Sequence, residues 1–356
     1  MEKRLSRFRE LLLERNLTLA LITDENNIGY LCGYRFDDGC LLITPANAYI
    51  ITDFRYEEEA KRYALREFSV VTPLCKSAFI SDVAKKENAE SIAYESRAMT
   101  VENYHAFKEA VSLPFIAMGD ILIEMRAQKD REEINAIKTA QEIAEAAFDA
   151  LLDTIHPHMT EREIALELSY FMQKNGAEKE SFDIIAVSGD ASALPHGKCR
   201  NLPISTGFLT LDFGCVYKGY RSDMTRTLSV GRACNEMKLI YKTVLEAQES
   251  AIQFIREGAL CKDIDAVARG VIERAGYGDA FGHSLGHGVG LDIHELPTLS
   301  PRATARKLTK GNIITVEPGI YLAGKYGCRI EDMGLVTENG FENFTKTTKE
   351  LIELFV

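Results

Sequence analysis

The sequence predicts a mixed α/β (α+β) protein with a smaller first domain and a second domain made of two similar halves. Residues 17–120 alternate short β-rich runs with helical patterns, which is typical of an α/β domain. A long amphipathic helix begins near residue 130, and the chain after it contains an internal repeat. Because duplicated segments fold into equivalent halves, we expect a pseudo-twofold domain with a site between its halves.

Composition narrows the kinds of function that this chain can have. Its 356 residues include 46% hydrophobic side chains, enough to build the cores of two or three domains. The 42 lysines and arginines face 53 acidic residues, a formal charge of -11, which disfavours binding to nucleic acid or an anionic membrane. No apolar run is long enough to span a bilayer. We therefore expect chemistry on small molecules or peptides.

The cysteines and the opening segment indicate the compartment. The eight cysteines lie far apart and include no Cys-x-x-Cys pair, as in proteins whose thiols stay reduced. Arg9, Glu10, Glu14 and Arg15 interrupt the leucine-rich opening before a secretory core could form. We therefore expect a cytoplasmic protein without zinc–cysteine sites.

The first domain is expected to begin with an amphipathic helix, because Leu5, Phe8 and Leu12 share one helical face. The runs LALIT, CLLIT, AYIIT and SIAY predict strands, and YEEEAKRYA and VENYHAFKEAV predict helices. We place the boundary near 122–128, which gives domains 1–124 and 125–356.

The second domain is expected to open with one long helix. Asp130 and Glu133 form a capping-box pattern at its start. Its apolar face comprises Ile134, Ile137, Ala144, Phe148 and Leu151.

Three pairs of segments form the internal repeat. They are EIALELSYFMQKNGAE (163–178) and DIDAVARGVIERAGYG (263–278), TLDFG (210–214) and TVEPG (315–319), and GYRSDMT (219–225) and GCRIEDM (327–333). The first pair reads as two amphipathic helices, each closed by a glycine, Gly176 or Gly276. Any one match could arise by chance, but three in the same order favour duplication.

The repeat superposes Asp212 on Glu317 and Asp223 on Glu331. Four carboxylates converging between apolar strands would repel one another, and each isolated buried charge costs several kcal/mol, roughly. Two divalent cations would balance the four charges, and a neutral histidine could join them. The alternative is four separately solvated surface acids, which the flanking apolar strands and the repeat symmetry disfavour.

Strand geometry predicts how each acid pair comes together. A two-residue hairpin turn at Lys218–Gly219 would set Asp223 opposite Gly214, diagonally next to Asp212 on the same face. A turn centred on Gly324 would set the two glutamates opposite each other.

The stretch FGHSLGHGVGLDIHE (281–295) contains three histidines. His283 and His287 have the spacing of a zinc-binding helix, but the expected glutamate is missing and four glycines would weaken a helix. An extended segment is therefore predicted. In a strand, His287 and His294 face opposite sides unless a bulge intervenes, so we expect one ligand and two substrate-facing groups.

Taken together, these motifs resemble the prolidase and aminopeptidase P branch of the pita-bread metallopeptidases, a group related to creatinase. The resemblance covers nearly the whole chain. Its motifs are LLIT with AYIITDFRY, SALPHG, LDFG with GYRSDMTRT, GHSLGHGVGLDIHE, TVEPGIY and GCRIEDM. It implies a creatinase-like N-terminal domain followed by a pseudo-twofold pita-bread catalytic domain.

The resemblance also implies a set of site residues. The five ligands of a dinuclear metal site would be Asp212, Asp223, His287, Glu317 and Glu331. A hydroxide bridging the two ions would attack the scissile carbonyl, with Glu317 taking the proton from the attacking water. Catalytic or substrate-binding roles are implied for His196, His283 and His294, with Arg329 and Tyr321 beside them and Phe182 and Ile184 lining a proline pocket. The donor set favours manganese, with cobalt, iron or zinc as alternatives.

The activity implied is that of an Xaa-Pro aminopeptidase or an Xaa-Pro dipeptidase acting on proline-containing peptides as a homodimer. Many dipeptidase relatives carry an arginine four residues after the last histidine of the motif, where this chain has Thr298, with Arg302 nearby. This departure favours longer Xaa-Pro peptides over dipeptides. The alternatives are a creatinase-like hydrolase that does not use metals and a non-catalytic peptide-binding module on the same fold.

Overall fold

The computed structural model describes residues 2–355, and the chain divides into two compact units, Met1–Met125 and Arg126–Val356. All eight cysteines are free thiols. Within residues 2–355, no helix combines the length and the apolar character needed to cross a bilayer.

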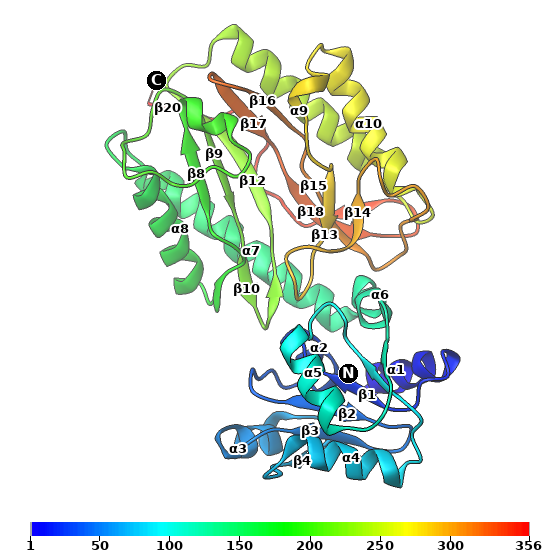
Figure 1. Ribbon diagram of the computed structural model, residues 1–356. Coiled ribbons are helices and arrows are strands. Elements are labelled where there is room, and N and C mark those ends of the chain that lie inside the picture. The colour runs from blue at the N-terminus through cyan, green and yellow to red at the C-terminus, as the bar shows by residue number, and fades with distance from the viewer. Residues whose placement is uncertain (1, 356) are drawn as a thin grey trace. The chain divides into compact units, whose positions relative to one another are not determined.

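The first unit is a mixed six-stranded sheet with helices, in the strand order β4-β3-β2-β1-β5-β6 (Figure 1). Its strands are β1 (Ala20–Ile22), β2 (Cys40–Ile43), β3 (Ala48–Ile51), β4 (Ser69–Val71), β5 (Ile92–Tyr94) and β6 (Phe115–Ala117). Its helices are α1 (Glu2–Glu14), α2 (Glu25–Cys32), α3 (Phe54–Tyr63), α4 (Lys76–Lys86) and α5 (Val101–Ala110), and α6 (Ile121–Ala127) spans the boundary with the second unit. Leu5, Phe8 and Leu12 of α1 are buried, as the helical pattern predicted.

The helices of the second unit carry the clearest sign of duplication. They are α7 (Arg131–Thr154), α8 (Glu161–Lys174), α9 (Asn235–Phe254) and α10 (Cys261–Arg274). The bounds of α8 and α10 differ by the offset that the sequence repeat predicted, and each helix is followed by a glycine with positive φ, 103° at Gly176 and 87° at Gly276. Asp130 and Glu133 form the predicted capping box at the start of α7.

Two sheets lie side by side in this unit (Figure 1). The first has the order β20-β12-β9-β8, and the second has the order β14-β13-β15-β18-β19. Helices α7 and α8 pack on the first sheet and α9 and α10 on the second, and each pair shares an apolar core with its sheet. The strands and short helices are β7 (Lys179–Glu180), β8 (Ile185–Ser188), η1 (Gly189–Ala193), β9 (Gly207–Phe213), β10 (Cys215–Tyr217), β11 (Tyr220–Arg221), β12 (Met224–Val230), η2 (Gly278–Ala280), β13 (Gly286–Gly288), β14 (Glu295–Leu299), β15 (Ile313–Val316), β16 (Gly319–Leu322), β17 (Tyr326–Arg329), β18 (Asp332–Val336), β19 (Phe341–Asn343) and β20 (Glu353–Leu354).

Each half contains a long bent hairpin that bears two acids. In the first, Asp212 pairs with Thr225 across β9 and β12, and the hairpin closes between Tyr217 and Tyr220, so the turn at Lys218–Gly219 is confirmed. In the second, β15 pairs with β18, and β16 pairs with β17 around the predicted turn at Gly324. An isolated antiparallel bridge between Thr225 and Glu331 joins the two hairpins, so the halves meet where their acids lie.

Candidate metal centre

Four acidic side chains stand at the ends of the paired strands. Asp212 belongs to β9, Asp223 directly precedes β12, Glu317 directly follows β15, and Glu331 directly precedes β18. Asp223 and Glu331 are 4% and 1% exposed, and the other two acids are half-buried. The strand pairing therefore brings all four into one region at the junction of the two sheets.

His287 completes this group from β13. Its Nε2 lies 3.5 Å from Oδ2 of Asp223 and 3.4 Å from Oε1 of Glu317. One possible ligand atom each from Asp223, His287 and Glu331 lies within 4.8 Å of the others. These separations are close enough for several of these atoms to bind one ion.

The tautomer of His287 leaves a lone pair facing the acids. Its Nδ1 lies 3.1 Å from the carbonyl oxygen of Gly288, which can only accept a hydrogen bond, so Nδ1 carries the proton. Burial, followed by the charge of His294, lowers the pKa of His287 to about 4, so the ring is neutral at physiological pH. Nε2 therefore has no proton to offer to the two carboxylates beside it.

Burial and mutual repulsion act strongly on the acids. Burial, followed by the charge of Glu331, raises the pKa of Asp223 well above its ordinary value. Burial, followed by the charges of Glu317 and Asp212, does the same for Glu331, and burial raises the pKa of Glu317 to about 8. A cation among these groups would favour their ionised forms and remove the repulsion.

The residues present fit divalent metal ions. Oδ1 of Asp212 and Oε1 of Glu331 are buried atoms without a hydrogen-bond partner, and buried oxygens are rarely left in that state. Together with the lone pair of His287, they are available as ligand atoms. A set of four carboxylates and one imidazole suits manganese and similar ions better than a thiolate-selected metal.

Arg329 lies against this centre and is 3% exposed. Its Nη2 donates to Oδ2 of Asp212 at 2.5 Å, and its Nη1 donates to the hydroxyl of Tyr321 at 2.8 Å. Its Nε donates to Oγ1 of Thr225 at 3.1 Å, and that hydroxyl donates to Oε2 of Glu331 at 2.7 Å. One guanidinium therefore orients an acid from each half.

Two threonines beside the acids were missed by the sequence analysis. Thr225 lies two residues after Asp223, and Thr315 lies two residues before Glu317, so each shares a strand face with its acid. Oγ1 of Thr315 donates to Oε1 of Glu317 at 3.3 Å and accepts from the backbone N–H of His287 at 3.1 Å. The patterns Asp-x-Thr and Thr-x-Glu could have indicated them.

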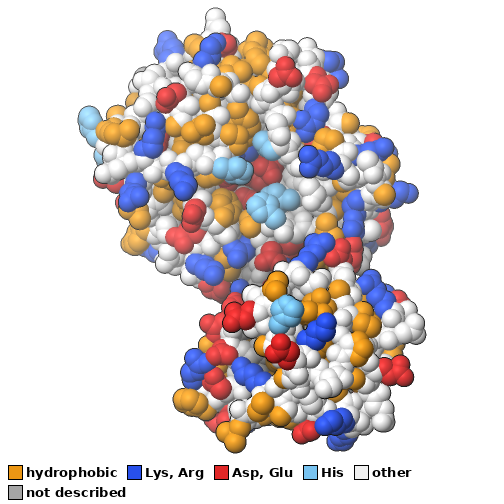
Figure 2. All heavy atoms as spheres, viewed as in Figure 1, with side chains coloured by type: hydrophobic (Ala, Val, Ile, Leu, Met, Phe, Trp, Pro, Cys, Tyr) orange, Lys and Arg blue, Asp and Glu red, His pale blue; other side chains and the backbone are white. Residues whose placement is uncertain are grey.

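The remaining histidines of the motifs surround the acids. Figure 2 shows histidine side chains gathered around acidic side chains in a recess of the larger unit. The ring centroids of His287 and His294 are 4.3 Å apart, and the strand pairing shifts register between Gly286 and Gly288. His196 and His294 are exposed. After burial, the largest effect on the pKa of His294 is the charge of His196, which lowers it.

His283 is held differently. Its Nδ1 lies 2.8 Å from the carbonyl oxygen of Ser284, and its Nε2 lies 2.9 Å from the hydroxyl of Tyr321. Burial lowers the pKa of His283 to about 4. The neutral ring therefore donates from Nδ1 and accepts the tyrosine proton at Nε2.

Four other residues from the sequence analysis lie at separate positions. Phe182 and Ile184 are half-buried between β7 and β8, and Ile184 packs against the core of the first half. Thr298 is half-buried on β14, and Arg302 is exposed in the loop that follows it.

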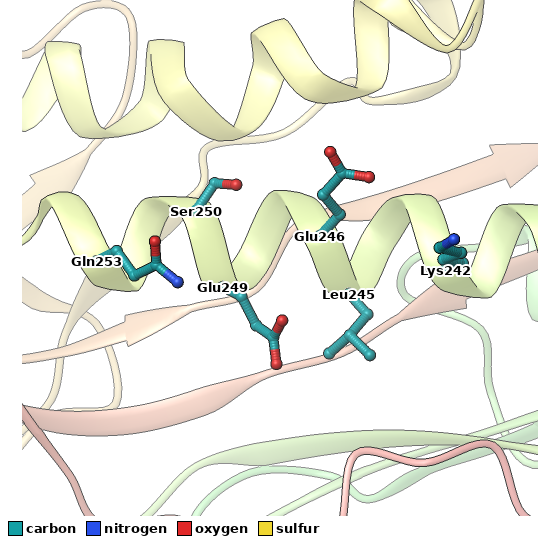
Figure 3. A pocket seen from close by; sticks show the side chains of 6 residues that line it. All are labelled: Lys242, Leu245, Glu246, Glu249, Ser250 and Gln253. Carbon is teal, nitrogen blue, oxygen red and sulfur yellow. The ribbon is translucent and has the colours of Figure 1, made fainter.

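A shallow pocket of about 390 Å³ lies along α9 (Figure 3). It is lined by Lys242, Leu245, Glu246, Glu249, Ser250 and Gln253. These side chains come from one helix and point in different directions, and none belongs to the predicted site. We therefore assign it no chemical role.

Comparisons with known proteins cover nearly the whole chain. The profile of metallopeptidase family M24 matches residues 135–338, and that of the creatinase/prolidase N-terminal domain matches residues 4–128. An uncharacterized peptidase, YqhT, of Bacillus subtilis is 38% identical, with 99% of this chain and 100% of the relative covered.

Two solved structures are also similar. The Xaa-Pro dipeptidase from Bacillus anthracis superposes with a TM-score of 0.96 at 41% identity, covering 99% of each chain. The X-Pro aminopeptidase from Thermotoga maritima superposes with a TM-score of 0.89 at 37% identity, covering 96% of this chain and 99% of the other.

Proposed function

Because this chain belongs to metallopeptidase family M24, we propose that it is a metal-dependent exopeptidase that hydrolyses the bond before proline at the N-terminus of peptides. The observation that carries the proposal is the group of four carboxylates and one neutral imidazole, in which Oδ1 of Asp212 and Oε1 of Glu331 are buried without a hydrogen-bond partner. The names of the two similar structures, a dipeptidase and an aminopeptidase for Xaa-Pro bonds, support the substrate class.

Two divalent cations would be held by Asp212, Asp223, His287, Glu317 and Glu331. We assign manganese first, with cobalt, iron or zinc as alternatives, because the donors are mostly carboxylate oxygens. When bound, the ions would lower the pKa of a water molecule, polarise the scissile carbonyl and stabilise the developing oxyanion.

The chain's own residues supply the proton transfers. Glu317 accepts the proton of the attacking water, and Thr315 holds one of its carboxylate oxygens in place. His294 and His196 are exposed beside the centre, so their rings can contact the substrate and pass a proton to the leaving proline nitrogen. His283 and Tyr321 form a hydrogen-bonded wall, and Arg329 orients Asp212 from within the protein.

Proline changes what a peptidase must recognise. The bond before proline is a tertiary amide without an N–H, so a site that grips that hydrogen would lose its contact. Selection for proline then depends on apolar packing, for which we propose Phe182 and Ile184.

Substrate length is assigned from Thr298. A dipeptide places its free carboxylate close to the scissile bond, where a bidentate arginine would bind it strongly. Thr298 has no charge, and Arg302 lies further along in an exposed loop. We propose that the enzyme prefers longer Xaa-Pro peptides over dipeptides.

The testing experiment compares Ala-Pro with Ala-Pro-Ala. Chelated enzyme is resupplied with manganese, and hydrolysis is measured for wild type, Asp223→Ala and Thr298→Arg. Metal-dependent cleavage lost in the first variant supports the peptidase, and a shift towards Ala-Pro in the second supports the assignment of length. Absence of cleavage by fully metallated wild type would instead favour a creatinase-like hydrolase or a peptide-binding module.

The proposal also includes a cytoplasmic homodimer. Eight free thiols are suited to a reducing compartment. Sedimentation equilibrium of the purified chain tests the oligomeric state.

A further inference from the structure

A buried carboxylate on α8 gathers five hydrogen bonds from two residues. Glu161 is 0% exposed. Its Oε1 accepts from N and Oγ of Ser188 at 2.7 and 2.9 Å and from Nη2 of Arg200 at 2.6 Å. Its Oε2 accepts from N and Nε of Arg200, both at 2.9 Å. Such a charged, fully satisfied cluster is rigid as long as all of its members remain.

The two donors bracket the segment that carries His196. Ser188 is the last residue of β8, and Arg200 lies four residues after the histidine. Nη2 of Arg200 also donates to the carbonyl oxygen of Ser188 at 3.0 Å. Both ends of residues 189–199 are therefore tied to each other and to α8.

The middle of this segment is attached to the other half of the unit. Oγ of Ser192 accepts from the N–H of Gly327 at 2.9 Å. The carbonyl oxygen of Pro195 accepts from Nη1 of Arg329 at 3.3 Å. A side chain at position 327 would collide with the loop, since its Cβ would lie 2.4 Å from the carbonyl oxygen of Ser192. Little freedom remains for the backbone directly before His196.

We propose that Arg200 is a positioning residue for His196. Held by Glu161, it closes the 189–199 loop and fixes the height at which the imidazole stands over the carboxylate centre. The inference rests on the proposed peptidase function for its activity readout. A displacement of about 1 Å at a reacting group can cost on the order of 10²-fold in rate, so closing this loop has a catalytic consequence.

The second half contains a comparable pair that provides a matched control. Asp265 on α10 is 1% exposed and accepts from Nε of Arg269 at 2.8 Å. Arg269 in turn donates to the carbonyl oxygens of Phe281 and His283 at 2.8 and 2.9 Å. This arginine holds Phe281 and His283, and Asp265 accepts from the N–H of Leu285 at 3.1 Å. Neither residue is bonded to the loop of His196, so removing Arg269 should leave that loop unchanged.

The first experiment is a double-mutant cycle on metallated enzyme. Arg200→Ala is expected to lower kcat/KM for Ala-Pro-Ala by on the order of 10- to 100-fold, whereas in the His196→Ala background the same change costs about twofold or less. Arg162→Ala serves as the neutral control, because Arg162 is an exposed arginine on α8, the helix that carries Glu161. Equal losses from Arg200→Ala in both backgrounds would overturn the proposal, because a general loss of stability does not depend on His196.

Hydrogen exchange provides a readout that does not depend on turnover. Arg200→Ala should accelerate amide exchange in residues 189–199 and leave 281–285 unchanged, and Arg269→Ala should do the reverse. Unchanged exchange in 189–199 would overturn the positioning role. If the two variants show these exchange changes but the wild-type enzyme cleaves no Xaa-Pro peptide, the loop closure is supported and the peptidase function is rejected.

Discussion

In the first half of the larger unit, the hairpin of β9 and β12 presents two aspartates, whereas in the second half the hairpin of β15 and β18 presents two glutamates. The frame around them is the same, with α8 and α10 at equivalent positions. The second half adds His287, and the first adds the loop of His196. Duplication has thus kept the backbone positions of the four acids and allowed the groups around them to differ.

Two arginines at equivalent repeat positions show this divergence. Arg221 donates from Nε to the carbonyl oxygen of Leu291 at 3.0 Å and from Nη1 to that of Ser181, so it joins loops of both halves. Arg329 donates to Asp212 and to Tyr321. The same residue type at equivalent repeat positions therefore joins backbone segments in one case and orients Asp212, an acid of the candidate metal centre, in the other.

Removing one acid from either half should have the largest effect. We expect Asp223→Ala and Glu331→Ala each to lower kcat/KM by at least about 10³-fold, roughly 4 kcal/mol, because both halves contribute to one metal centre. Activity with Mn²⁺ and bound metal per subunit are measured, with Asp153→Ala, an exposed acid on α7, as control. An active Glu331→Ala enzyme would show that the halves do not share the centre.

The second largest effect should be on the stability of the protein at low pH, through the ion pair of Glu161 and Arg200 in the first half. Burial alone would raise the pKa of Glu161, but Arg200 and the hydrogen bonds to this carboxylate outweigh it and lower the pKa below its ordinary 4.5. A depressed pKa contributes stability that is complete above pH 4.5 and is lost as the pH falls through the folded-state pKa. Glu161→Gln should unfold with roughly 3 kcal/mol less free energy at neutral pH.

Urea unfolding of wild type and Glu161→Gln from pH 7 downwards provides the measurement. The two stability curves should converge below pH 4.5, because protonation removes the same ion pair from wild type. Parallel curves would mean that the charge of Glu161 contributes nothing to stability.

The arginine comparison predicts a smaller effect on metal affinity. Arg329→Met should weaken Mn²⁺ binding by about 10- to 100-fold, since a residue that orients a ligand typically has this effect when lost. Arg221→Met should lower the melting temperature but change the Mn²⁺ affinity by no more than about twofold, because residues that do not interact affect each other's energetics by roughly this factor or less. Calorimetric titration measures both affinities, and equal weakening in both variants would contradict the distinction between the two arginines.

Helix capping gives the smallest difference. Thr160 caps α8 with a reciprocal bond to Glu163, whereas Leu260 at the corresponding place before α10 provides no side-chain cap. Thr160→Ala should lower the free energy of unfolding by about 1 kcal/mol, and Thr160→Ser should retain most of it. Chemical denaturation measures both, and an unaffected Thr160→Ala protein would show that the cap is dispensable.

The repeated helices and hairpins of the larger unit could largely be predicted, because they depend on the local periodicity of apolar residues. The positions of α8 and α10 follow from the helical patterns of the two repeats in the sequence. The turns at Lys218–Gly219 and Gly324 follow from the alternating pattern of the strands on either side. The family and the fold class were confirmed by the comparisons. The assignment of ligands and substrate contacts remains a prediction.

The supporting contacts could not be predicted in the same way. Glu161 and Arg200 are 39 positions apart, and no periodic pattern links a helix start to the end of an irregular loop. The approach of His287 to His294 likewise depends on a shift of register between β13 and β14, and single residues do not announce such a shift. These contacts arise from tertiary packing.

The bridge between Thr225 and Glu331 gives metal binding a second consequence. Because the acids on both sides of this bridge come from different halves, an ion bound there acts as a cross-link that exists only in the folded chain. By mass action, a free metal concentration 100 times the dissociation constant adds about 2.7 kcal/mol to stability. The supply of metal in the cell would then set the lifetime of this protein against proteolysis as well as its activity.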